Sequence, residues 1–506
     1  MGSKTSDYDL NSLIKDYGSD NNPIILQRLQ HIVNVSNGDP KLAKAATEKI
    51  DSIIETYGYC VLGLKNNNNN NNNNSNNNNN NNGSNLNERN QSIIKQLDNE
   101  ILILNKSKNL DDFAKLQNLN YEKAIRYLLE NETIMAINSL NISNQSYFKR
   151  FSNYSICKDL ENYCMLMAYN KNFESLENQC SRKLNSFREF YNKKIDNSKN
   201  DANNDDFDNN DINGDDDDDD EEEENNDDFR LYGTHQTSEV EQLKLKDLKE
   251  RLISQEIISY WNCKFLMIFA HFQLSNYEEV ITGFFDLLQD APIGRVSAID
   301  VLKQKITDKN LNHIISFDDL ITVFALSILI VKPIRDQLEM IKNEDFQNLL
   351  DEYEDFENLI KLFNFNVNCQ FHMFNEKFYE LITSKYKYNI YLFNDLNKIN
   401  LILRQKQYLL IFANFEKIEL KYLLKKLNFS IANIDYLESE ILLLIKVLNL
   451  NIDYDDNKKI FSRRTNLKNL QKLELVDSLN KLYEQINNDE EVAVKLRSTL
   501  FERVGS

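Results

Sequence analysis

Residues 430–463 read SIANIDYLESEILLLIKVLNLNIDYDDNKKIFSR, and the spacing of the apolar residues changes within this stretch. In its first part they recur every three or four residues, as on one face of a helix; the stripe is Ile434, Leu437, Ile441, Leu444, Ile445 and Leu448. Ser430 is the predicted N-cap of that helix. From Leu448 to Tyr454 every second residue is apolar, which is the period of a strand. Residues 455–458 then connect to a second predicted strand over 459–462, completing a hairpin.

Two more helices are predicted before this stretch and one after it. Helical spacing marks 399–413 and 420–427, the latter through Leu420, Leu423, Leu424 and Leu427. Three helices followed by a hairpin are the order of a winged helix, which we predict over 391–465. A C-terminal helix is predicted over 466–490, and its apolar stripe is Leu467, Leu470, Leu473, Val476, Leu479, Leu482 and Ile486.

A faint internal repeat occupies the middle of the chain. The segment NYEKAI at 120–125 is echoed by NFE at 172–174 and NYEEVI at 276–281, each after an apolar stretch and a polar break. Asn can cap a helix, and Glu in the first turn favours the positive end of the helix dipole. The clearest helix pair is Trp261–Phe272 followed by Tyr277–Leu288. We therefore predict a mainly α fold, a tetratricopeptide-like solenoid followed by a winged helix.

Charge and composition limit the classes of protein. The 506 residues carry a net charge of −20, and 17 acidic residues lie within 201–229, which holds no Lys or Arg. The remainder therefore has a net charge of only −3, which argues against a strongly basic nucleic-acid binder. The chain has 11 Gly and 4 Pro, too few turn residues for an all-β protein.

Two low-complexity tracts divide the chain. We predict a disordered Asn-rich insert at 63–92 and a disordered acidic insert at 196–237, because neither can bury enough apolar surface. The predicted ordered parts are an N-terminal helical segment at 8–62, helical repeats at 93–195, and helical repeats at 238–390 that lead into the winged helix.

The sequence favours a soluble intracellular protein. Its N-terminus has no apolar run typical of a secretory signal. The most apolar run, Leu320–Val331, has 12 residues, whereas a membrane-spanning helix needs about 20. The six Cys are scattered without a CxxC pair, so we expect neither disulfides nor a zinc site.

Three stretches resemble a known family. Residues 9–32 contain Asp9-Leu10, Tyr17 and ILQRLQHI, similar to a D-L-x-x-Y…R-L-x-x-I segment. Residues 316–335 begin SFDDL and end in Arg335, similar to S-P-E-D-V…A-L-x-x-x-x-R with Phe317 in place of Pro. Residues 420–461 resemble the family's winged helix. These stretches resemble the PCI-domain family shared by the proteasome lid, the COP nine signalosome and translation initiation factor three, and within it the chain looks like a member of the signalosome subunit 1 family.

The resemblance implies a non-catalytic scaffold. Such a subunit supports the removal of the ubiquitin-like modifier Nedd8 from cullins of cullin–RING ubiquitin ligases. The implied partners are other PCI and MPN-type subunits and, as a further candidate, the cullin–RING ligases themselves, in the cytoplasm and the nucleus. A proteasome-lid subunit similar to non-ATPase subunit 7 stays open as the alternative.

The residues themselves do not predict an enzyme. The five His, at 31, 235, 271, 313 and 372, are isolated from one another, and no HExxH or HxH pair offers a zinc site. Neither a GxxxxGK[ST] phosphate loop nor a GxGxxG segment is present. We therefore expect no catalytic residue, no metal and no cofactor.

Nucleic-acid binding is the second class that a winged helix raises. The helix that would enter a major groove, about 432–448, holds Asp435, Glu438 and Glu440 against Lys446 alone, which repels phosphates. A basic face is expected on the preceding helix and consists of Lys417, Lys421, Lys425 and Lys426. We interpret it as a solvated face, so nucleic-acid binding is disfavoured.

Assembly is the function that the sequence favours. A small winged-helix sheet leaves an exposed edge, and the resemblance implies that PCI proteins join such edges side by side. The predicted interface residues in the hairpin are Leu450, Ile452, Lys459 and Phe461. Those in the C-terminal helix are Leu470, Leu473, Val476, Leu479 and Leu482, and we expect this helix either to join a bundle with the terminal helices of neighbouring proteins or to pack on its own domain.

Overall fold

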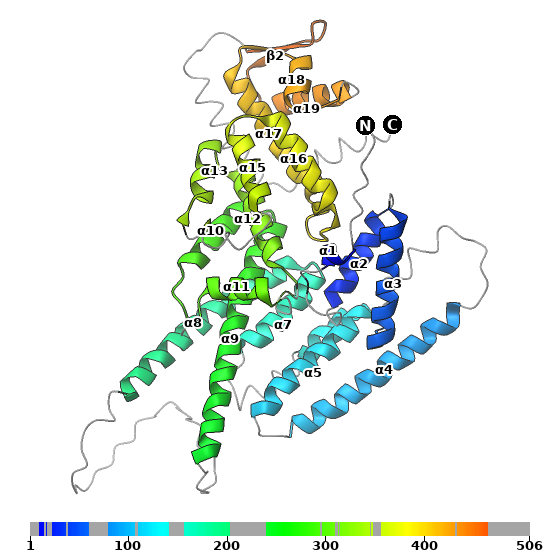
Figure 1. The fold of residues 1–506 in the computed structure, drawn as a ribbon, viewed down its shortest axis with the longest axis vertical. Coiled ribbons are helices and arrows are strands. Elements are labelled where there is room, and N and C mark those ends of the chain that lie inside the picture. Colours follow the sequence, from blue (N-terminus) through cyan, green and yellow to red (C-terminus); the bar gives the residue numbers. More distant parts are fainter. Residues whose placement is uncertain are drawn as a thin grey trace.

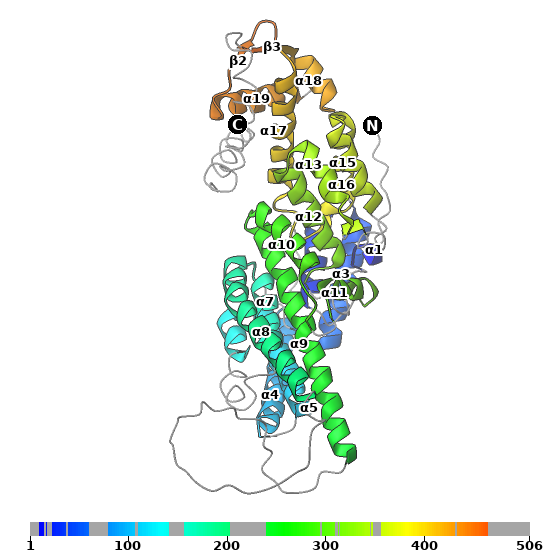
Figure 2. The ribbon, with the colours of Figure 1, turned by 90° about the vertical axis from the view of Figure 1, so that its left-hand side faces the viewer.

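The computed structural model describes residues 10–14, 17, 23–36, 39–59, 79–106, 110–140, 156–202 and 239–293 and, with short gaps, 296–347, 356–430 and 433–463. These residues form a mainly helical molecule with one small sheet, as the sequence predicts. Figures 1 and 2 show an elongated arrangement, with the sheet at one end and helix pairs at the other.

Three helices form the N-terminal part, namely α1 (Leu10–Ile14), α2 (Pro23–Val35) and α3 (Pro40–Tyr57). Helix α3 starts sharply because the Asp39 side chain accepts hydrogen bonds from the N–H groups of Lys41 and Leu42, both at 3.1 Å. It ends at Gly58, whose φ of 64° is left-handed and favours glycine. Helices α2 and α3 pack against each other.

A run of paired helices follows. Its members are α4 (Asn79–Leu104), α5 (Leu110–Leu129), α7 (Ile156–Tyr169), α8 (Phe173–Ala202), α9 (Glu239–Gln273) and α10 (Tyr277–Gln289). Helix α4 packs on α5, α5 on α7, and α7, α8 and α9 pack on one another, with α10 against α9 (Figure 1). The predicted pair 261–272 and 277–288 falls within α9 and α10, so it is confirmed as two helices.

One turn recurs at the ends of helices in this run and again after the later helix α15 (Phe356–Val367). A residue with φ between 54° and 65° follows the helix, and the next N–H bonds back to the carbonyl five residues earlier, which is a Schellman turn. The left-handed residues are Asn131, Lys171, Ser275 and Cys369; the N–H···O distances, for Glu132, Asn172, Asn276 and Gln370, are 2.9, 2.9, 2.8 and 2.8 Å.

The next helix begins directly after each turn, so the positions of the turns can be compared with the predicted helix starts. The starts at Asn172 and Asn276 are confirmed, because α8 and α10 begin at the following residue. The start predicted at Asn120 is wrong, since Asn120 lies inside α5 and is buried. The turn comes later, at Asn131, because the apolar spacing continues to Leu129 and keeps the helix intact.

The middle of the molecule is built around one buried helix. The elements here are α11 (Ala298–Thr307), α12 (Phe317–Val331), α13 (Ile334–Ile341), α15 (Phe356–Val367), α16 (Phe371–Ser384) and the 3-10 helix η3 (Tyr386–Tyr388). Helix α12 is buried on nearly all sides, and Phe324 stacks on Phe284 of α10 at 4.2 Å. The apolar run expected to be a buried helix is therefore confirmed as one.

Residues 396–463, here called the C-terminal module, complete the described chain. They comprise α17 (Leu396–Asn414), β1 (Lys417–Glu419), α18 (Leu420–Lys426), α19 (Ile434–Val447), β2 (Ile452–Asp455) and β3 (Ile460–Arg463). The sheet is antiparallel, with strand order β1-β3-β2. Helix α17 joins two cores, because Ile399 packs in the core of the helical array whereas Phe412 packs in that of the module.

The module differs from the predicted boundaries at three points. Strand β1 was not predicted, and Lys417, expected on a helix, lies on it. Helix α19 is flanked by Asn433 as N-cap instead of Ser430. Strand β2 starts at Ile452, not at 448, because Asn449 has a φ of 50° and the Leu450 N–H bonds to Ile445 O at 2.9 Å, which closes α19 with another Schellman turn.

Helices extend into both predicted inserts. Helix α4 begins at Asn79, inside the expected insert 63–92, and α8 continues to Ala202, inside 196–237. Tertiary contacts hold the first of these extensions, since the buried Asn90 donates to Glu130 Oε1 at 2.8 Å and accepts from Arg126 at 3.0 Å. The rest of both inserts lies outside the described residues.

Candidate interaction site

Strand β2 is one of the two edge strands of the sheet. Strand β3 lies between β1 and β2 and is paired on both sides. Strand β1 runs directly into α18, and the Leu420 N–H bonds to Lys459 O at 2.9 Å. Within the part of the chain that the structure describes, no strand lies beyond β2. The sheet therefore has two edge strands, β1 with three residues and β2 with four, and the longer edge, that of β2, is the candidate for pairing (Figure 2).

The register shows which backbone groups of β2 point outward. The Arg463 N–H bonds to Glu416 O at 2.9 Å, so residue 463 directs its backbone groups toward β1. Direction alternates along a strand, so Ser462 directs its groups toward β2, where it pairs with Asp453. Asp453 and Asp455 therefore bond to β3, and the backbone groups of Tyr454 point away from the sheet. The N–H of Ile452 is already bonded to Leu450 O at 2.8 Å.

Phe461, one of the predicted interface residues, is a core residue. It is 1% exposed on the central strand. Its ring packs edge to face on Phe412 at 5.6 Å and stacks on Tyr454 at 4.5 Å. The prediction of an interface role for this side chain needs correction, because the alternating pattern identifies the inward face of a strand and not its edge. Leu450 and Ile452 are half-buried against the same core.

Lys459 links three parts of the module. It occupies the hairpin turn with a left-handed φ of 54°. Its Nζ lies 3.0 Å from both carboxylate oxygens of Glu438 on α19 and 2.7 Å from Asp456. The hydrogen bonds to Asp456 and Glu438 raise the pKa of Lys459. The lysine therefore fixes the hairpin relative to α19 and holds β2 in place.

A buried ion pair attaches α19 to α17. Glu440 is 2% exposed and accepts from Arg404 Nε at 3.1 Å, from Arg404 Nη2 at 3.0 Å and from Tyr408 Oη at 2.9 Å. Bidentate pairs of this kind fix geometry as well as charge. The sequence predicts that Glu440 and Glu438 repel phosphates, and this needs correction, because cations of the module already pair with both carboxylates.

The exposed surface of β1 and α18 carries basic and aromatic side chains together. Lys417, Lys421 and Lys425 are exposed and form no ion pair within the described residues. Phe415 and Tyr422, 40% and 44% exposed, lie edge to face at 5.9 Å. The expected solvated basic face is thus present, with Lys417 contributed by a strand.

A buried polar cluster joins the N-terminal helices to α12 and to the segment after η3. Asp319 accepts from Tyr17 Oη at 3.0 Å, from Arg28 Nη2 at 3.3 Å and from Asn389 Nδ2 at 2.6 Å. The Arg28 guanidinium lies over the Tyr17 ring and also donates to Ile314 O at 2.9 Å. Burial raises the pKa of Tyr17. Two of the stretches that carry the family resemblance, 9–32 and 316–335, therefore meet in this cluster.

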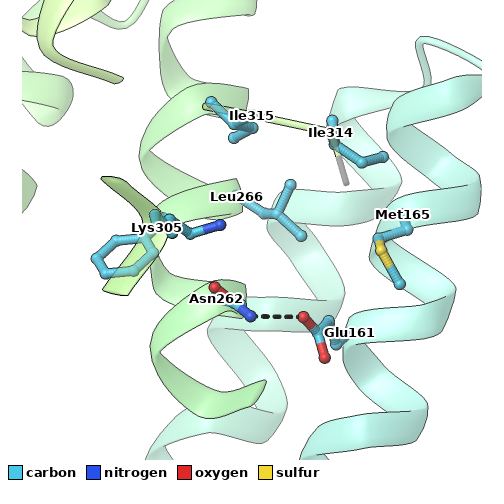
Figure 3. A pocket seen from close by; sticks show the side chains of 8 residues that line it. Glu161, Met165, Asn262, Leu266, Lys305, Ile314 and Ile315 are labelled. Carbon is cyan, nitrogen blue, oxygen red and sulfur yellow. Dashed lines mark hydrogen bonds between the residues drawn. The ribbon is translucent and has the colours of Figure 1, made fainter. Parts of the chain in front are cut away.

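A second polar cluster lines a small cavity between α7, α9 and α11 (Figure 3). Glu161 accepts from Ser259 Oγ and Asn262 Nδ2, both at 2.7 Å, and from Lys158 Nζ at 2.9 Å. Burial lowers the pKa of the neighbouring Lys305 to about 8. The cavity volume of about 20 Å³ is enough for one water molecule and too small for a cofactor.

The remaining site predictions have different outcomes. Leu470, Leu473, Val476, Leu479 and Leu482 lie outside the described residues. Among the residues that are described, no group of three or more His, Cys, Asp or Glu is arranged to hold a metal ion. In the same part of the chain, no helix is both long enough and apolar enough to cross a membrane.

Comparison with known proteins adds no relative. No protein-family model matches the chain, and a search of the curated proteins finds no match.

Proposed function

We propose that the chain is a non-catalytic scaffold subunit of the COP nine signalosome type, which supports removal of Nedd8 from cullins. The first support is the element order. Helix pairs closed by a recurring turn lead into α17, α18 and α19 and a three-stranded sheet. We interpret the helix pairs as tetratricopeptide-like repeats and the C-terminal module as a winged helix, the combination that defines PCI proteins.

The second support is the buried cluster around Asp319. Tyr17 and Arg28 come from one resembling stretch and Asp319 from another, and all three are in direct contact. Residues that serve one cluster depend on each other, because a buried charge without its partner costs several kcal/mol. The resemblance therefore involves residues that act together in this fold.

The observation that carries the proposal is the free edge of β2. An edge strand offers backbone groups to a strand of a neighbouring subunit, and the side chains on either side provide specificity. The Arg404–Glu440 pair and Lys459 hold this edge in a defined orientation at the end of the array. The predicted helix at 466–490 would add a second attachment, to PCI and MPN-type neighbours in the cytoplasm and nucleus.

A pair of variants at Tyr454 tests the edge. Tyr454→Ala removes the ring that stacks on Phe461 but keeps the N–H, whereas Tyr454→Pro removes both. The N–H points away from β3, and Pro is tolerated at such edge positions. We expect both variants to give the same melting temperature, and only the Pro variant to lose co-purifying subunits in affinity purification.

The identity of the co-purified proteins distinguishes the candidates. Signalosome subunits, together with accumulation of Nedd8-modified cullins in cells that lack the chain, support the proposal. Proteasome-lid subunits with normal cullin modification would assign the chain to the lid alternative. Equal co-purification by Tyr454→Pro and Tyr454→Ala would refute pairing through β2.

The surface of β1 and α18 favours one other class, a nucleic-acid-binding winged helix. Exposed aromatic rings beside lysines can stack bases and neutralise phosphates. Titrating a labelled single-stranded oligonucleotide into the purified chain tests this, with Lys421→Glu plus Lys425→Glu as the matched variant. Binding that disappears in this variant and weakens with salt would favour nucleic acid.

A further inference from the structure

Three helices bring cysteine sulfurs together in the core. Cys164 lies on α7, Cys180 on α8 and Cys263 on α9, and all three are fully buried. The Sγ atoms of Cys164 and Cys180 are 3.4 Å apart. Cys180 Sγ also lies 3.8 Å from the carbonyl oxygen of Cys263, while Cys263 Sγ lies 3.9 Å from the carbonyl oxygen of Cys157. Cys164 and Cys180 thus form a close pair, with Cys263 beside them.

The hairpin of α7 and α8 explains why the pair is close. The left-handed turn at Lys171 reverses the chain within three residues, from Tyr169 to Phe173. Positions 164 and 180 lie 16 residues apart, on either side of this turn. Both helices also pack on α9. Their mutual position is therefore held by a third element, which keeps the two sulfurs in contact.

The surroundings of the two thiols shift their pKa values in opposite directions. The contacts with Cys164 and Cys263 lower the pKa of Cys180, and the positive charge of Lys264 acts in the same direction, whereas burial opposes the shift. The interaction with Cys180 raises the pKa of Cys164. We assign Cys180 as the attacking thiol and Cys164 as its partner, because the thiolate is the reactive form and the sulfurs are in contact at 3.4 Å.

We propose that Cys164 and Cys180 are an oxidative modification site, which forms a reversible disulfide between α7 and α8 when the chain meets a peroxide. A disulfide has an S–S length of about 2.05 Å, so the sulfurs approach by only a little over 1 Å from their separation of 3.4 Å. Side-chain rotation within the hairpin supplies this movement.

The reaction balances with hydrogen peroxide as the oxidant. The Cys180 sulfur attacks one peroxide oxygen and the O–O bond breaks, which gives a sulfenic acid at Cys180 and one water. The Cys164 sulfur then attacks the Cys180 sulfur, the S–O bond breaks, and the hydroxyl leaves as a second water with the Cys164 proton. Two thiols lose two hydrogens in total, and one peroxide becomes two waters. Because the sulfurs are buried, we expect the peroxide to reach Cys180 during local opening of the hairpin, and the disulfide to form when the hairpin closes and brings the two sulfurs back into contact.

Mass spectrometry of the full chain tests the proposal. The native chain is treated with hydrogen peroxide, its remaining thiols are blocked with N-ethylmaleimide in denaturant, and the product is digested without reductant. We expect a cross-linked peptide containing Cys164 and Cys180, two fewer alkylated thiols, and full recovery of both after dithiothreitol. Cys263→Ser and Cys369→Ser should keep the cross-link, whereas Cys164→Ser and Cys180→Ser should abolish it.

Three results would overturn the proposal. These are complete alkylation of both cysteines after peroxide, a cross-link that uses Cys263 or Cys157 in place of either residue, and irreversible oxidation of Cys180 without a cross-link. The wild-type measurement alone decides among them, so the proposal does not depend on whether a variant folds.

Discussion

At the scale of single residues, buried carboxyl groups connect distant parts of this protein. Asp319, Glu256 and Glu440 are buried, and each accepts hydrogen bonds from residues far away in the chain. A buried carboxylate is stable only where donors surround it. Such residues therefore connect distant segments, and changing one of them affects the contact between two elements.

Asp319 should be the most sensitive of these positions. Asp319→Asn removes the charge opposite Arg28, whose guanidinium is equally buried. We expect a loss of about 3 kcal/mol in the free energy of unfolding, because the arginine is left without its counter-ion. Urea denaturation measures this change. The control is Glu48→Gln in the exposed pair with Lys44, at 3.7 Å, which should cost less than about 1 kcal/mol. Equal effects at both positions would contradict the prediction.

Glu256 should make stability depend on pH. Its carboxylate accepts from the N–H groups of Cys157 and Lys158 at the start of α7, at 2.9 and 3.3 Å. Burial nevertheless raises its pKa from 4.5 to about 8. Between these two values the folded chain binds the proton and the unfolded chain does not, so this contribution to stability falls as pH rises from 4.5 to 8.

The variant Glu256→Gln isolates that effect. The amide oxygen can still accept from the two N–H groups, but it does not titrate. We expect the free energy of unfolding of the wild type, measured by urea denaturation, to fall with pH more steeply than that of the variant. At pH 8 the extra loss should be on the order of 4 kcal/mol. Parallel pH profiles of wild type and variant would show that Glu256 is ionised throughout.

At the scale of elements, the ends of helices decide where segments meet. The Schellman turns at Asn131, Lys171, Ser275 and Cys369 each end one helix and allow the next to begin at once. Helix α12 ends differently. Its last carbonyl groups accept hydrogen bonds from a lysine side chain of another helix. Lys406 Nζ on α17 lies 2.8 Å from Leu329 O, 3.0 Å from Ile330 O and 2.7 Å from Lys332 O.

Lys406→Met removes the ammonium group but keeps an unbranched side chain of similar length. The buried carbonyl oxygens of α12 would lose their donor, each at a cost of about 1 kcal/mol or more, so we expect a loss of about 3 kcal/mol in the free energy of unfolding. Lys398→Met on the same helix removes the partly buried hydrogen bond to Ser275 Oγ and serves as the control. Thermal melting followed by circular dichroism compares the two, and a similar shift for both would contradict the capping role.

At the scale of the whole molecule, the helical array and the C-terminal module have separate cores joined through α17. The described elements account for the packing, whereas the Asn tract at 66–78 and the acidic tract at 203–229 contribute almost no apolar residues. The apolar residues available for packing therefore lie almost entirely outside the two tracts.

Deleting the two tracts should leave assembly intact. Removal of 66–78 or 203–229 shortens the connections before α4 and before α9, and the entropy of loop closure changes slowly with loop length. We expect the melting temperature to change little and the deleted chains to be incorporated normally in a reconstituted complex, measured by size-exclusion chromatography. Loss of incorporation would show that a tract makes a required contact. Deletion of 396–463, the C-terminal module, is the control that should abolish incorporation.

The sequence alone determined the features that depend on local periodicity. The apolar spacing placed α17, α18, α19, the buried α12 and the α9–α10 pair, because each buries a face that recurs at the helical period. The alternation after Leu448 predicted the hairpin for the same kind of reason. Tertiary structure alone decided which segments meet. Strand β1 has three residues and forms only because β3 pairs with it, and the cysteines at 164, 180 and 263 come together only because three helices pack. No local sequence pattern predicts such contacts, because the free energy that stabilises them comes from packing between residues distant in the chain.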